Sequence, residues 1–253
     1  MIVVSAASGA LGRLAVAALS DRAEVVAAVR DPARAPDGVP VRRGDYDDPA
    51  SLREAFAGAD RLLLISSPEL DPAVRIRHHQ NAITAAEQAG AGAVVYTSLL
   101  GAGTQAAGAT EAHHVTEKAL AASGLPHTIL RHSYYGDAFV PQVTDGELTS
   151  STGGRGLNTA FRSDLAQAAA NVLTGEGHIG RAYDFTGPLW TYPAVAEALG
   201  VPYREVPDAG PGAMAWLNAQ VRAGSMEYQS PDLEKVLGRP AVSMLEHLRG
   251  RLP

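Results

Sequence analysis

The segment from His113 to Lys118 carries ionisable side chains at a spacing suited to proton transfer. His114 and Lys118 are four residues apart, so they share one face if the segment is helical. Such a pair can place an acid at one position and, at the other, an ammonium that binds a ribose and favours the ionised form of the acid. A histidine beside a cation loses its proton more easily, so His114 is less often protonated and is a poorer proton donor. Lys118 is therefore the first candidate for a catalytic role.

Two further side chains are candidate proton donors. His113 lies about 100° around the same helix, where it could donate a proton or form a solvated pair with Glu117. Tyr135 follows a strand predicted over 126–130, where it could donate a proton or form a wall beside a planar ring. Tyrosines at such a position can equally be packed without a catalytic role.

The first twelve residues predict a strand, a tight turn and a helix. A β-branched apolar run ends in small residues, and apolar residues at helical spacing begin at Leu11. Such a turn lets the backbone approach a dinucleotide pyrophosphate at the N-terminus of the helix. The candidate positions are Ser8, Gly9, Ala10, Leu11 and Gly12. Ala6 stands where this spacing usually begins with glycine, which is tolerable if Ala6 keeps a negative φ. The alternative is an ordinary turn of an α/β protein.

A second strand, predicted over 24–29, ends at Arg30 and Asp31. In dinucleotide-binding folds an arginine at this strand end accommodates a ribose 2′-phosphate, whereas an acid accepts a hydrogen bond from a 2′-hydroxyl. Arg30, with Arg13 or Arg34, predicts NADP(H), and Asp31 could instead serve NAD(H). The expected cofactor is NAD(P)H, with NADP(H) favoured over NAD(H).

Polar residues also follow three further predicted strands. Ligands of open parallel sheets lie beyond the carboxyl ends of the strands, so these side chains are expected to converge on one cofactor site. Asp45 could bind the adenine amine or be an ordinary turn aspartate. Hydroxyl groups are common at strand ends for turn formation, so only their convergence is informative. The candidates are Asp45, Tyr46, Ser66, Ser67, Thr97 and Ser98.

Strands alternate with helices through the first half of the chain. This alternation predicts an α/β fold, a Rossmann doubly wound parallel sheet of order 3-2-1-4-5-6, with a possible seventh strand over 183–186. We expect residues 1–132 with 157–188 to bind NAD(P) and residues 133–156 with 189–253 to form a small α+β subdomain for the substrate. Residues 138–158 are expected to be a lid or substrate loop, Ser163 to cap a helix, and Ser243 with Glu246 to form a capping box.

Composition excludes several classes of function. The 253-residue chain has a formal net charge of -6 and dispersed Lys and Arg, which argues against nucleic acid and anionic membrane partners. It contains no cysteine, so it has neither disulfides nor thiolate chemistry, and we expect a cytoplasmic location. The adjacent histidines at 78–79 and 113–114 lack the spacing of a zinc pair, so no metal site is expected.

Together these motifs resemble the NmrA-like atypical short-chain dehydrogenases, most closely the type 2 NAD(P)H:quinone oxidoreductases. The resemblance covers almost the whole chain and rests on the segments 8–12, 29–34, 44–46, 63–67, 96–100, 113–118 and 162–166. It implies a two-part molecule that binds cofactor and planar substrate in a cleft between its parts. His114 stands where most short-chain dehydrogenases have a catalytic tyrosine, which the family's quinone reductases also lack. Hydride would then pass directly from the nicotinamide to a quinone.

Two alternative functions remain open. NmrA-like proteins include tailoring enzymes that reduce or oxygenate aromatic polyketides, and the segments 138–158 and 207–229 look shorter than in the quinone reductases, which could admit a larger ring system. They also include redox sensors that bind NAD(P) and partner proteins without turnover. The expected ligand is a planar aromatic or quinone small molecule, and the chain is expected to be a monomer or homodimer.

Overall fold

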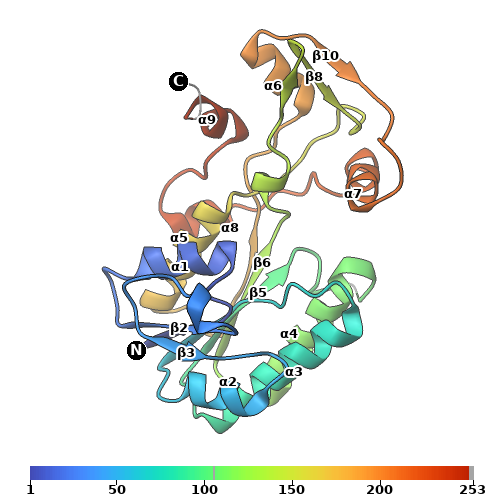
Figure 1. Ribbon diagram of the computed structural model, residues 1–253. Coiled ribbons are helices and arrows are strands. Elements are labelled where there is room, and N and C mark those ends of the chain that lie inside the picture. The colour runs from blue at the N-terminus through green and yellow to red at the C-terminus, as the bar shows by residue number, and fades with distance from the viewer. Residues whose placement is uncertain (105, 251–253) are drawn as a thin grey trace. The chain divides into compact units, whose positions relative to one another are not determined.

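The computed structural model of the protein describes residues 1–104 and 106–250, which form two compact units (Figure 1). The first unit comprises Met1–His132 and Arg162–Asp184. The second comprises Ser133–Phe161 and the described residues from Phe185 onward. The assignment of cofactor binding to one unit and substrate binding to the other stays a prediction.

A seven-stranded sheet of order β3-β2-β1-β4-β5-β6-β9 forms the centre of the first unit. The pairings from β3 through β6 are parallel. This order confirms the predicted doubly wound sheet and adds β9 as its seventh strand. The strands are β1 (Ile2–Val4), β2 (Val25–Val29), β3 (Val41–Arg43), β4 (Arg61–Leu64), β5 (Val94–Leu99), β6 (His127–His132) and β9 (Ala182–Phe185).

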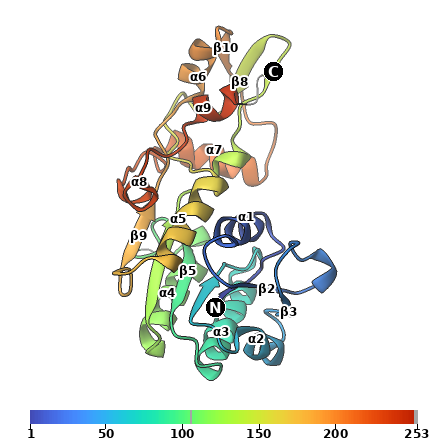
Figure 2. The same ribbon diagram turned by 90° about the vertical axis from the view of Figure 1, so that its left-hand side faces the viewer.

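Helices cover both faces of this sheet, which explains why its central strands are apolar throughout rather than alternating. α1 (Ala10–Leu19) and α5 (Arg162–Thr174) pack against each other on one face. α2 (Pro49–Phe56), α3 (Pro72–Gln88) and α4 (Glu111–Ser123) lie side by side on the other (Figure 2). The core beneath these three helices includes Val3, Val26, Phe56, Leu62, Leu64 and Tyr96, all buried.

Side-chain caps fix where α2 and α3 begin. Asp48 accepts a hydrogen bond from the Ser51 backbone N–H at 3.2 Å, and Asp71 accepts one from Ala73 at 2.8 Å, each with proline at the first helical position. These starts agree with the sequence prediction. The cap predicted at Ser163 is wrong, because α5 already begins at Arg162 and Ser163 lies within its first turn.

The second unit contains a small sheet of order β10-β8-β7 and four helices. Its elements are β7 (Val143–Thr144), β8 (Glu147–Ser150), α6 (Tyr192–Leu199), β10 (Tyr203–Glu205), α7 (Ala213–Arg222), α8 (Asp232–Leu237) and α9 (Met244–Arg249). Short 3-10 helices lie at η1 (Pro32–Arg34) and η2 (Gly108–Thr110) in the first unit and at η3 (Gly136–Ala138) in the second. The hydrophobic core of the second unit includes Leu148, Leu157, Phe161, Trp190, Val195 and Val221.

Residues 138–158, expected to be a lid or substrate loop, contain a hairpin at their centre instead of an irregular loop, and the lid or substrate role stays a prediction. β7 and β8 pair antiparallel across Asp145 and Gly146, whose φ angles are 52° and 77°. Asp-Gly is the dipeptide that tight hairpin turns favour, because both central residues of such a turn need positive φ. The predicted capping box is confirmed, since Ser243 and Glu246 bond reciprocally at the start of α9.

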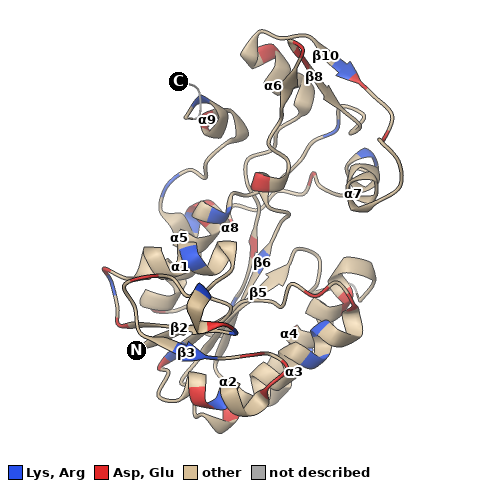
Figure 3. Ribbon diagram, in the orientation of Figure 1, with Lys and Arg blue, Asp and Glu red and all other residues tan. Residues whose placement is uncertain are grey.

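Both basic and acidic residues occur along the ribbon of each unit (Figure 3). Within the described part of the chain, no helix combines the length and the apolar composition needed to cross a membrane. The same residues contain no group of three His, Asp or Glu side chains arranged to hold a metal ion.

Candidate active site

The turn after β1 packs closely against the start of α1. Its backbone is anchored by hydrogen bonds from Ser5 N–H to Leu63 O at 2.9 Å and from Ala7 N–H to Ala28 O at 3.2 Å. A Cβ on Gly12 would lie 2.5 Å from Ala6 O and 2.7 Å from Ala7 Cα, so only glycine fits there. Gly9 precedes α1 without a side-chain cap, which leaves the first N–H groups of the helix for an anion. This cradle fits a pyrophosphate.

Ala6 departs from its prediction. Its φ is 47°, in the left-handed region, whereas the sequence reasoning required a negative value. The turn accepts this conformation because Ala6 O receives the Gly9 N–H at 2.9 Å, which closes the turn. Alanine therefore occupies a backbone conformation that favours glycine.

Three arginines surround the turn at the end of β2. Asp31 caps η1 by accepting a hydrogen bond from Ala33 N–H at 3.0 Å. The Arg13 guanidinium donates to Ser8 O at 3.1 Å and also to Arg34 O. Arg30 is exposed, and none of the described residues forms a hydrogen bond or ion pair with its guanidinium. The Asp31 carboxylate therefore caps its own turn, whereas the Arg30 guanidinium is available to bind an anionic ligand.

Tyr46 joins the ends of three strands instead of offering its hydroxyl to a ligand. Tyr46 Oη donates to Ile65 O, lies 2.7 Å from Ser5 Oγ, and Ser5 Oγ accepts from Ile65 N–H at 2.9 Å. These three bonds form a closed ring. Burial raises the pKa of Tyr46, so the phenol stays protonated. A contact of Tyr46 with cofactor stays a prediction for its ring.

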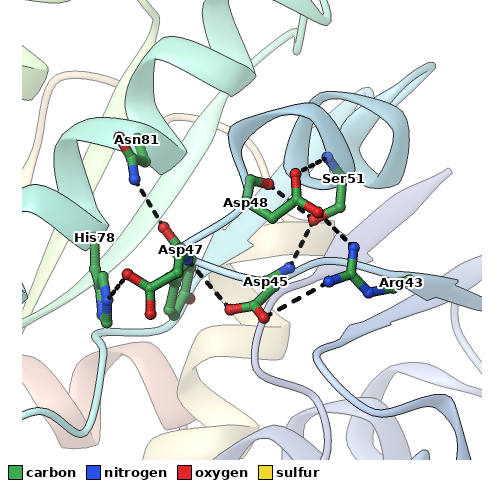
Figure 4. Close-up of polar contacts among 8 residues, drawn as sticks. Arg43, Asp45, Asp47, Asp48, Ser51, His78 and Asn81 are labelled. Atoms are coloured by element: carbon green, nitrogen blue, oxygen red, sulfur yellow. Dashed lines mark hydrogen bonds and ion pairs between the residues drawn. The ribbon is translucent and has the colours of Figure 1, made fainter.

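The loop after β3 is held by its own carboxylates (Figure 4). Asp45 Oδ1 accepts from Asp47 N–H at 3.2 Å, and Arg43 Nη2 lies 3.8 Å from Asp45 Oδ2. Arg43 also bonds to Asp48 at 2.6 Å. The geometry favours the turn role for Asp45, and its contact with adenine remains a prediction.

The hydroxyl residues predicted at the strand ends bond either to a neighbouring strand end or to a helix. Ser66 and Thr97 come together at neighbouring strand ends, with Thr97 Oγ1 accepting from Ser66 N–H at 3.0 Å. Ser98 instead donates to Glu117 Oε1 at 2.7 Å, on α4. Ser67 Oγ lies 2.9 Å from His78 Nδ1. These hydroxyls mainly connect the strand ends to the helices.

His113 is buried inside the first unit. Its Nδ1 lies 2.8 Å from Tyr96 Oη, and Glu117 pairs with Arg131 at 2.8 Å, so the alternative of a solvated pair between His113 and Glu117 is wrong. Burial, followed by the charge of Arg75, lowers the pKa of His113 to about 3. Burial also raises the pKa of Tyr96, so this contact joins a protonated phenol to a neutral imidazole.

The other proposed catalytic groups differ in their surroundings. His114 Nδ1–H donates to Ala102 O at 2.7 Å, which leaves Nε2 as an acceptor in the neutral ring. Lys118 is exposed, and its ammonium has no polar partner within the described part of the chain. Tyr135 is half-buried in the second unit, where its backbone bridges to Ala160. The catalytic roles of all four residues stay predictions.

Two histidines of α3 were overlooked as site residues. His78 and His79 are 5% and 0% exposed, yet all four ring nitrogens lie within 3.0 Å of a polar atom from outside α3. From the sequence, these two histidines were considered only as possible zinc ligands and were rejected for their spacing. Adjacent histidines on a helix that must pack against a sheet are the signal that could have identified them.

Comparisons with known proteins agree with the fold. A family described as NAD(P)H-binding matches residues 6–176. The chain is similar to quinone oxidoreductase 2 of Escherichia coli (strain K12), with 32% identity over 97% of this chain and 96% of that protein. The solved structure of Citrobacter sp. triphenylmethane reductase with NADP(H) superposes with a TM-score of 0.91, 30% identity and coverage of 100% of both chains. The NADPH complex of the Escherichia coli quinone oxidoreductase QOR2 gives 0.86, 31% identity and 99% coverage of both chains.

Proposed function

The chain belongs to the NAD(P)H-binding, NmrA-like oxidoreductases, and from this membership we propose that it transfers hydride from NADPH to a quinone or a related planar aromatic carbonyl compound. Its relatives include a quinone oxidoreductase and a triphenylmethane reductase, and the substrates in both names are ring compounds. The observation that carries the proposal is the uncapped glycine turn together with the uncommitted Arg30.

The residues of this chain fit a dinucleotide phosphate. In our proposal the turn from Gly9 to Gly12 holds the pyrophosphate, and Arg30 neutralises the 2′-phosphate. Arg13 already lies between the turn and the 30–34 segment, where it adds positive charge. When bound, the reduced nicotinamide supplies the hydride.

A quinone is already an electron acceptor, so the protein has to orient it and stabilise the developing phenolate. His113 is a candidate for the second task, because its Nε2 has no polar partner among the described residues while its Nδ1 lies against Tyr96. The Lys118 ammonium would bind the nicotinamide ribose. His114 and Tyr135 remain candidate sources of the proton that completes the hydroquinone.

Steady-state turnover tests this proposal. Purified protein is assayed under anaerobic conditions for NADPH and NADH oxidation with simple benzoquinones, polycyclic quinones and a triphenylmethane dye. We expect turnover with at least one quinone and a preference for NADPH. A preference for polycyclic quinones would support the tailoring alternative. Tight NADPH binding without turnover of any acceptor would refute the reductase proposal and favour a redox sensor.

A further inference from the structure

We infer that His78 and His79 of α3 are positioning residues, which hold the loops after β3 and β4 to each other and to α4. The inference rests on the proposed function, because it assigns these loops and α4 to the two ends of the cofactor. Neither histidine has a ring nitrogen left for a substrate, since all four nitrogens lie within hydrogen-bond distance of polar atoms of the protein. Their effect must therefore pass through the backbone and side chains that they hold.

The hydrogen bonds of His79 fix its tautomer. Its Nε2 accepts from Ser67 N–H at 3.0 Å, so this nitrogen carries no proton. Thr116 Oγ1 donates to Ala112 O at 2.6 Å and lies 2.8 Å from His79 Nδ1, so Nδ1–H donates to the threonine. Burial, followed by the charges of His113, Arg75 and His78, lowers the pKa of His79 well below its usual value. The neutral ring is thus a rigid link between the loop after β4 and α4.

His78 links the loop after β4 to the loop after β3. Its Nε2 lies 2.9 Å from Asp47 Oδ1 (Figure 4). Its Nδ1 lies 2.9 Å from Ser67 Oγ. The carboxylate can only accept, since bonds to Arg77 and His78 lower the pKa of Asp47. His78 therefore donates from Nε2, while its Nδ1 holds the Ser67 hydroxyl within hydrogen-bond distance. Asn81, one turn further along α3, supports the same loop by donating to Tyr46 O at 2.8 Å.

This Ser-His-Asp arrangement has the connectivity of a hydrolytic triad, but its burial excludes that chemistry. Ser67 is 2% exposed, and its Oγ also accepts from Glu69 N–H at 3.3 Å. A nucleophile has to reach a substrate carbonyl, which this hydroxyl cannot do. The arrangement instead connects two loops.

The order of the sheet assigns a different effect to each histidine. The loop after β3 lies beside the end of β2, on the side where Arg30 is proposed to bind the adenosine phosphate. The loop after β4 and α4 lie on the other side, and α4 carries His113 and Lys118. Loss of the His78 links should therefore weaken cofactor binding, whereas loss of the His79 links should slow turnover.

Amide substitutions remove one link at a time. His79→Gln keeps an acceptor near the Nε2 position and loses the Thr116 link, whereas His79→Asn keeps a donor near Nδ1 and loses the Ser67 link. By the same geometry, His78→Gln keeps the Asp47 link and His78→Asn keeps the Ser67 link. His127→Asn is the control. That ring is half-buried, and its one polar contact among the described residues is with Leu125 O, just before β6.

The inference predicts a split between kinetic parameters. Each His79 variant should lower kcat about tenfold and leave the NADPH Kd within about twofold. Each His78 variant should raise the NADPH Kd about five- to tenfold, measured by nicotinamide fluorescence, with kcat at saturation within about twofold. Wild-type values in the His79 pair or the His78 pair, or losses that match the loss of folded protein by circular dichroism, would overturn it.

A nitrogen NMR spectrum of the protein without cofactor gives a readout that needs no turnover. It should show His79 protonated on Nδ1 and His78 protonated on Nε2, and the opposite tautomer at either ring would overturn the inference. If the wild type binds NADPH but reduces no quinone, the proposed function fails while the NADPH affinities and the tautomers still decide this inference.

Discussion

Arg30 is the residue that most directly determines the choice between the two nicotinamide cofactors. Arg30→Ala should weaken NADPH binding about ten- to a hundredfold, the effect of losing one charge-assisted hydrogen bond. NADH binding should stay unchanged because NADH lacks the 2′-phosphate. Isothermal titration with both cofactors measures this, with Arg53→Ala, an exposed arginine of α2, as the control. Equal NADPH affinity in Arg30→Ala and wild type would remove Arg30 from the site.

Lys118 has an exposed ammonium that no described residue holds, so its loss should affect function without affecting stability. Lys118→Met should lower kcat/KM about ten- to a hundredfold, if the ammonium forms a charge-assisted bond with the nicotinamide ribose. Steady-state kinetics measure the loss, and thermal unfolding should match the wild type. Unchanged turnover and unchanged cofactor affinity would show that Lys118 lies outside the site.

Ala6 has a positive φ of 47°, a conformation that disfavours a Cβ. Ala6→Gly should therefore raise the free energy of unfolding by about 0.5 to 1 kcal/mol, the cost of left-handed alanine less the extra chain entropy of glycine. Urea unfolding measures the change. Cofactor affinity should stay the same or improve, and a clear loss of affinity would mean that the methyl group itself supports the turn.

At the scale of elements, the buried histidines predict how stability depends on pH. Burial lowers the pKa of His113 and of His132 to about 3 from 6.5. Below pH 6.5 these two histidines become protonated in the unfolded chain but stay neutral in the folded protein. The free energy of unfolding should therefore fall as the pH drops from about 6.5 toward about 3. Each ring adds a slope of up to about 1.4 kcal/mol per pH unit within this window.

Urea unfolding between about pH 7 and about pH 4.5 tests this slope before most carboxylates titrate. His113→Asn should flatten the pH dependence, whatever it does to stability at neutral pH. A free energy of unfolding that stays constant across this range would show that these histidines are protonated in the folded state.

The elements of the first unit could be predicted because their signals are local. Unbroken apolar runs, and Asp-Pro pairs such as Asp48-Pro49 and Asp71-Pro72, define the strands and helix starts without reference to the rest of the chain. The hairpin at Asp145 was also encoded locally, by Asp-Gly, but the glycine-rich surroundings suggested a loop. Its small sheet depends on β10, more than fifty residues away, and such a pairing has no local pattern.

At the scale of the whole molecule, the sequence predicted the order of the strands but not how the side chains at their ends are used. Arg30 is exposed and the Gly9–Gly12 turn has no side-chain cap, and their contacts with the cofactor stay predictions. Tyr46, Ser67 and Ser98 were expected to face the cofactor, and their hydroxyls bond to other parts of the protein. That distinction depends on distances between segments far apart in the chain. The cytoplasmic location and the monomeric or dimeric state stay predictions.

Direct hydride transfer to a quinone is the central claim, and single-turnover stopped flow tests it most directly. The protein is loaded with NADPH carrying either hydrogen or deuterium at the transferred position, and mixed with the quinone that gave the highest turnover. We predict a single exponential loss of nicotinamide absorbance whose rate constant rises to a plateau with quinone concentration and is lower for the deuterated cofactor. Absorbance that stays constant, while the quinone demonstrably binds, would contradict the claim.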